Sequence, residues 1–248
     1  MDKDTDHARE ERTNRSQDFL NINSRTNAID SLETTVGFLQ RGDPFKWKWV
    51  AIAIHHALYS FSIAALENAN PAWVLSSGKK GRDDEGKFSK RGSESRWSKS
   101  RQVKFGRGPA YRIVWEETDE EPYISYEVRE PSLPTGKEQL IGFWTALARI
   151  QDERSIVHDV VSKPVPISDE DLKAIQWLAL RARNEFIHFT PKFWSIEIEG
   201  IRSGCAAALR AIDALVFQSH ALWRMKDDDR ARVTLAINSA TSLLTTEC

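Results

Sequence analysis

The feature that most constrains the fold is a run of eighteen residues without Lys, Arg, Asp or Glu, from Trp49 to Leu66. This length is at the lower edge of what a helix needs to cross a membrane. Polar side chains interrupt the run, however, and the sequence has no second segment of this kind. We therefore expect a fully buried central helix and no membrane partner, with a single membrane span as the alternative.

Helical periodicity and helix-boundary signals continue on both sides of this run. Gly42 ends the preceding helix, and Asp43-Pro44 places an acid and a proline where the next helix begins. The pattern predicts an all-α fold, a bundle of about six helices. The first predicted helix covers about 25–41, and the second begins at Asp43-Pro44 and continues to the end of the uncharged run. The others cover 137–154, 168–189, 195–224, and the chain from Asp227 onward.

The composition changes between the second and third helices, and we predict an insert at about 72–135. Residues 76–104 contain ten Lys or Arg against four acids, with Gly and Ser between them. This segment is either a flexible loop or a surface that attracts RNA phosphates. Alternating residues then predict a β-hairpin of about 110–116 and 123–129, so the insert contains a small β element. The candidate RNA-binding residues are Lys79, Lys80, Arg82, Arg91, Arg96, Lys99 and Arg101.

The length, net charge and cysteine content of the chain limit the number of domains, the partners and the metal sites that it can have. The 248 residues fit one helical domain, 25–248, interrupted by the insert and preceded by a charged extension, 1–24, that we expect to be disordered or frayed. A formal net charge of −1 gives no global attraction for nucleic acid. Two distant cysteines, Cys205 and Cys248, have no metal-ligand spacing. We expect a cytoplasmic protein without a metal or cofactor.

The helix predicted for 168–189 has the clearest boundaries. Ser168 with Asp171 three residues later is typical of an N-cap, and Pro191 should stop the helix near Phe189. One apolar stripe is a core face, while a second sector should meet another helix or a second subunit. The core stripe is Leu172, Ile175, Ala179, Ala182, Phe186 and Phe189, and the second sector is Trp177, Leu180, Asn184, Ile187 and His188.

The end of this helix carries a polar cluster. Asn184 and His188 are four residues apart and share a face, with Arg183 to one side. The helix dipole favours a protonated imidazole at this end, and an arginine can hold a phosphate through its planar fork. The alternative is that His188 only caps the helix and that Arg183 is an ordinary surface residue.

The run from Leu180 to Trp194 (LRARNEFIHFTPKFW) has Arg-Asn, three residues and then His, followed by Pro and Trp. It resembles the signature of the HEPN superfamily, and the resemblance covers about 27–70 and 137–224. Many members are metal-independent endoribonucleases of toxin–antitoxin, abortive-infection and CRISPR-linked systems, and they act as dimers. The resemblance thus implies a HEPN-like homodimer that cleaves RNA in a toxin or phage-defence role, with an antitoxin or regulator protein as a possible partner.

The resemblance also implies roles for the cluster. His188 would move a proton, Arg183 would stabilise charge on the phosphorane, and Asn184 would orient the ring or bond the phosphate. We leave His55 and His56 out of the catalytic set, because successive helical residues point 100° apart and cannot both face one site; they remain candidates for the dimer interface. The alternative function is a non-catalytic helical module that binds a protein partner, a nucleotide or RNA.

Overall fold

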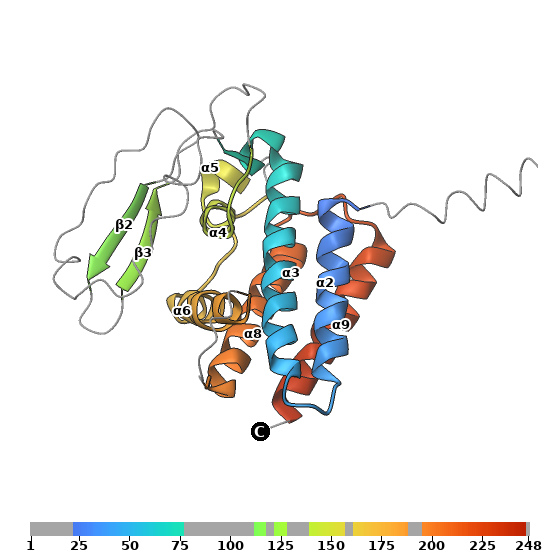
Figure 1. Cartoon of the computed structure of the whole chain (residues 1–248). Helices are drawn as coiled ribbons and strands as arrows, with labels where there is room; N and C mark the ends of the chain where they lie inside the picture. The colour runs from blue at the N-terminus through green and yellow to red at the C-terminus, as the bar shows by residue number, and fades with distance from the viewer. Residues whose placement is uncertain are drawn as a thin grey trace, which may run out of the picture.

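The structure is a computed structural model that describes residues 22–76, 139–156, 161–187 and 195–246, together with two strands at 112–117 and 122–127. Its secondary structure is mostly helical, which confirms the all-α class. In Figure 1, α2 and α3 lie side by side, α9 lies along α2, and α4 and α6 lie on the other side of α3.

Helix α2 (Ser24–Leu39) begins with a capping box rather than fraying into the extension. The Asn23 Oδ1 atom accepts the Thr26 amide at 2.9 Å, and the Thr26 hydroxyl oxygen accepts the Asn23 amide at 3.0 Å. These two bonds satisfy amides that the first turn leaves without helical partners. The predicted start near residue 25 is therefore close to the observed one.

Helix α3 (Lys46–Ala69) contains the uncharged run and forms the centre of the bundle. Its side chains at Val50, Ile54, Leu58 and Phe61 are almost completely buried, against α2, α4 and α8. Among the described helices it alone is long and apolar enough to span a membrane, and 72% of its most apolar window is buried inside the bundle. The expected capping by Asp43 is wrong, because the N-cap is Phe45 and the Asp43 carboxylate accepts from Arg41 instead.

The third predicted helix, 137–154, is replaced by several short elements. Strand β4 (Gln139–Leu140) pairs antiparallel with β1 (Leu75–Ser76), and helices α4 (Phe143–Ile150) and α5 (Glu153–Ile156) follow. The apolar periodicity of 140–150 continues across the strand and the helix, and the local sign of the break is Gly142, which is the N-cap of α4. The two strands close the base of the insert, where Leu75 faces Leu140.

Residues just before β1 belong to the core. The 3₁₀ turn η2 (Pro71–Val74) buries Trp73 and Val74, although the predicted insert began at about 72. Arg149 of α4 is completely buried, donates to the Trp73 carbonyl, and lies 5.4 Å from the centroid of the Trp73 ring. This arginine ties the third helical segment to the start of the insert.

The predicted hairpin is confirmed, with ends shifted by one or two residues. Strands β2 (Arg112–Glu117) and β3 (Pro122–Glu127) pair antiparallel, with Trp115 opposite Ile124. Pro122, which we expected in the turn, is the first residue of its strand. A proline is tolerated there because the first position of a strand can lack an amide donor.

From Asp169 onward, the described residues form three helical segments, two of which contain π-helical turns. Helix α6 (Asp169–Trp177) continues through η4 (Leu178–Arg183) into α7 (Asn184–Ile187), with Ser168 as its N-cap, as predicted. Helix α8 (Ile198–Asp213) continues into η5 (Ala214–Gln218), and α9 (Asp227–Thr246) ends the fold. The run predicted for 195–224 stops earlier, because His220 takes a left-handed φ of 59° and turns the chain.

Candidate functional site

Two of the three predicted catalytic residues lie at the junction of η4 and α7. Arg183 and Asn184 are both half-buried, and the Arg183 Nη1 atom donates to the Asn184 Oδ1 atom at 2.8 Å. The amide oxygen of Asn184 therefore holds the guanidinium in place. The expected role of Asn184, which directs its side chain to His188 or to a phosphate, would have to use its amide N–H groups, because the oxygen accepts from Arg183.

The third predicted catalytic residue, His188, lies outside the described residues. So do all seven candidate RNA-binding residues of the insert, and Phe189 of the core stripe. The expected contact between Asn184 and His188 thus stays a prediction. The residues in question are His188, Phe189, Lys79, Lys80, Arg82, Arg91, Arg96, Lys99 and Arg101.

The positive charge of Arg183 reaches both histidines of α3. Burial, followed by the charges of Arg183 and His56, lowers the pKa of His55 to about 3. His56 is exposed at its outer edge, but partial enclosure of its ring and then the charge of Arg183 lower its pKa, while Asp30 raises it. Both imidazoles are therefore neutral at neutral pH.

The two histidines have different surroundings. The His55 ring is buried, with its centroid 4.2 Å from that of Phe143 in α4, so it is a core histidine. The His56 Nδ1 atom lies 2.8 Å from the Ser31 hydroxyl oxygen of α2. The sequence did not predict that η4, which carries Arg183, packs against α3, because helical periodicity does not identify the segment that packs beside a central helix.

The continuous helix formed by α6, η4 and α7, which we call the motif helix, has part of its second apolar sector packed inside the chain. Trp177 and Leu180 are half-buried and pack against the core, whereas Ile187 is 43% exposed. A Cβ atom on Gly200 of α8 would lie 2.5 Å from the Trp177 ring, so this glycine lets α8 approach. The sector therefore meets another helix at Trp177, whereas Ile187 lies on the surface.

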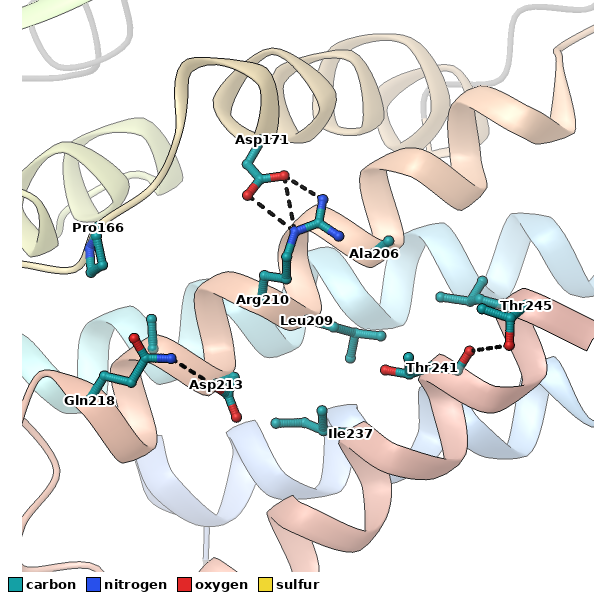
Figure 2. A pocket seen from close by; sticks show the side chains of 12 residues that line it. Pro166, Asp171, Ala206, Leu209, Arg210, Asp213, Gln218, Ile237, Thr241 and Thr245 are labelled. Carbon is teal, nitrogen blue, oxygen red and sulfur yellow. Dashed lines mark hydrogen bonds and ion pairs between the residues drawn. The ribbon is translucent and has the colours of Figure 1, made fainter.

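A cavity of about 480 Å³ lies between α6, α8 and α9, and Figure 2 shows its lining. The Arg210 Nε atom donates to both carboxylate oxygens of Asp171 at 3.2 Å, and Gln218 donates to Asp213 at 2.9 Å. The hydroxyl of Thr245 bonds the backbone of Thr241 at 3.2 Å. Since these polar groups form hydrogen bonds with one another, we interpret the cavity as a packing gap between three helices and not as a ligand site.

In the described part of the chain, no group of three or more His, Cys, Asp or Glu side chains is placed to hold a metal ion. Comparison with known proteins adds no family: no family model, no curated protein and no solved structure matches this chain. The resemblance to the HEPN superfamily therefore rests on the residues from Leu180 to Trp194 and on the helical pattern around them.

Proposed function

We propose that the chain is a metal-independent endoribonuclease of HEPN type, acting as a homodimer in a toxin or phage-defence setting. The observation that best supports this is the placement of Arg183. The residue is half-buried, its guanidinium is oriented by the Asn184 amide oxygen, and its charge lowers the pKa of both histidines of α3. A guanidinium fixed before substrate arrives can stabilise developing phosphate charge without reorganising.

In the proposed reaction, the 2′-hydroxyl of one ribose attacks the adjacent phosphorus, and the bond from phosphorus to the 5′-oxygen breaks. His188 accepts the 2′ proton or donates a proton to the leaving 5′-oxygen, and the second copy in the dimer performs the other transfer. Arg183 stabilises the negative charge on the phosphorane. The products are a 2′,3′-cyclic phosphate and a 5′-hydroxyl.

The second candidate is a non-catalytic helical module that binds a protein, a nucleotide or RNA. The bond between Arg183 and Asn184 also favours this candidate, because it would stabilise the helix end without any chemistry. The two candidates differ in one measurable property, since only the enzyme makes new RNA ends.

The test is gel cleavage of labelled single-stranded RNA in EDTA. Arg183→Ala and His188→Ala should each lower the cleavage rate by about a hundredfold or more. Arg181→Ala is the matched control, because Arg181 is exposed and lies two residues before Arg183 on the same segment. This variant should cleave RNA at the wild-type rate. Equal cleavage by all four proteins, or loss of cleavage in EDTA, would exclude the proposed mechanism, and melting curves separate lost activity from lost fold.

The dimer and the insert need their own measurements. Light scattering at micromolar concentration should give about twice the 28.3 kDa chain mass, and a monomer would argue against a composite site.

Removing residues 79–104 should weaken RNA binding and reduce its salt dependence if the basic residues contact phosphates. Unchanged affinity and salt dependence would make this segment only a loop.

A further inference from the structure

A second cavity, of about 570 Å³, lies along the side of the helix pair α2–α3. It extends from His56 toward Glu67 on α3 and is bounded on α2 by Ser24 and Asn27. The side chains of Val74 and Leu140, at the base of the insert, also line it. We call this cavity the α2–α3 pocket. Figure 1 shows the two helices that form its long sides.

Three hydrogen bonds cross between the helices at or near this pocket. The Ser24 hydroxyl donates to Glu67 Oε2 at 2.6 Å, and the Asn27 Nδ2 atom donates to the Ser60 hydroxyl oxygen at 3.0 Å. The third joins Ser31 and His56 at 2.8 Å. These bonds fix the positions of the polar side chains, so the pocket is preorganised.

The bond to Ser31 also fixes the tautomer of His56. A serine hydroxyl has one proton, and Ser31 donates it to the Asn27 carbonyl at 2.7 Å. The His56 Nδ1 atom must then be the donor to Ser31, and its Nε2 atom carries the lone pair. His56 therefore offers a hydrogen-bond acceptor from its exposed edge.

The polar side chains of the pocket include several acceptors beside amide and hydroxyl donors. Besides the His56 Nε2 atom, Glu67 presents a carboxylate and Asn27 presents its amide oxygen. No Lys or Arg is among the described residues that line the pocket. Glu67 is the one charged side chain among these described residues, so a phosphate would be repelled, whereas a group rich in N–H donors would be attracted to the carboxylate.

The remaining surface of the pocket is apolar. Ile63 and Val74 are buried beneath it, while Ile22 and Leu140 are exposed at its edge. Aliphatic side chains of this kind can cover the faces of a flat ring while polar groups bond its edge. The combination indicates a planar ligand with adjacent N–H groups.

We propose that the α2–α3 pocket binds a guanine base of the RNA substrate, with Glu67 accepting from guanine N1–H and N2–H. The proposal rests on the proposed ribonuclease function, and it adds the base that the enzyme selects. Guanine is the RNA base with two adjacent N–H donors on its Watson–Crick edge, which suits a carboxylate. Helix α3 connects the two sites, because its residue His56 lines the pocket and the helix packs against η4, which carries Arg183.

The experiment is calorimetric titration of the full-length protein with guanosine, inosine, adenosine, uridine and spermidine. Guanosine should bind best, and inosine, which lacks the N2 amino group, should bind more weakly. Glu67→Gln should weaken guanosine binding at least tenfold, whereas Glu197→Gln, at an exposed position before α8, should not. Equal affinity for all four nucleosides, or binding unaffected by Glu67→Gln, overturns the proposal. So does binding of spermidine in place of guanosine, which would make the pocket a cation site.

Cleavage assays separate this proposal from the ribonuclease proposal. If the protein cuts RNA and Glu67→Gln leaves its base preference unchanged, the pocket assignment fails while the ribonuclease stands. If guanosine binds through Glu67 but no RNA is cut, the ribonuclease fails while the guanine pocket stands. Glu67→Gln keeps an oxygen for the Ser24 hydroxyl, so the variant should melt close to wild type.

Discussion

Gly204 of α8 lies so close to Leu178 of η4 that a Cβ atom at residue 204 would be 2.6 Å from the Leu178 Cβ atom. The same atom would be 3.0 Å from the Ala174 carbonyl oxygen. Both neighbours are backbone or backbone-proximal atoms, so they cannot move aside as a flexible chain end would. The absence of a side chain at Gly204 therefore sets how closely α8 packs against the motif helix.

Gly204→Ala should destabilise the fold by about 1–3 kcal/mol, because the added methyl group overpacks the contact between the helices. Gly37→Ala is the matched control, since Gly37 is also within a helix but a methyl group there would have nothing within 4 Å. Removing a helical glycine at that position should stabilise by about 0.5–1 kcal/mol. Urea denaturation of both variants measures the difference, and equal effects would contradict the close packing at Gly204.

Asp171 and Arg210 give an expected dependence of stability on pH. The hydrogen bond from Arg210, with its charge, holds the pKa of Asp171 below its usual 3.8, although partial burial opposes this. The ion pair therefore contributes stability above pH 3.8, and this contribution is lost as pH falls below that value. Its size should be at most about 1 kcal/mol, because the Arg210 side chain is 61% exposed.

Denaturation of wild type and Arg210→Ala at pH 6 and pH 3 checks this. The variant should be less stable at pH 6, and the gap should narrow at pH 3. Asp171→Asn should behave like Arg210→Ala at both pH values. A gap that is the same at both pH values would mean that Arg210 acts through packing and not through the carboxylate.

Particular residues show how far the sequence could predict the fold and the site. The cap at Ser168 and the turn at Gly42 are local signals, and the structure has helix boundaries close to both. The break in the third helix was missed because Gln139 and Leu140 pair with Leu75 and Ser76, a contact that depends on distant residues. The packing of η4, which carries Arg183, against α3 was missed for the same reason. Periodicity predicts which face is buried, and it does not identify the helix that buries it.

His55 makes a separate contribution to the pH dependence of the protein's stability. Its pKa is about 3 in the fold, mainly because of burial, against an ordinary value of 6.5. Between these values the unfolded chain binds a proton that the folded chain does not, so stability should rise with pH from about 3 to 6.5 and fall on acidification. His55→Gln should flatten this rise. Chemical denaturation between pH 5 and 6.5, where most carboxylates stay charged, should show a smaller slope for the variant, and identical slopes would mean that His55 is not buried as a neutral base.

The last prediction tests whether Arg183 faces the histidines of α3. Removing its charge in Arg183→Gln should raise the pKa of His56, because the Arg183 charge lowers that pKa. Arg183→Lys keeps the charge and should leave the pKa closer to that of wild type. Asp30→Asn should have the opposite effect and lower the pKa of His56, since Asp30 raises it. NMR titration of the imidazole C–H signals, with His56→Gln used for assignment, measures all three variants. If the pKa of His56 is the same in wild type and Arg183→Gln, the Arg183 guanidinium does not lie close to α3. The candidate site would then not include the histidines of α3.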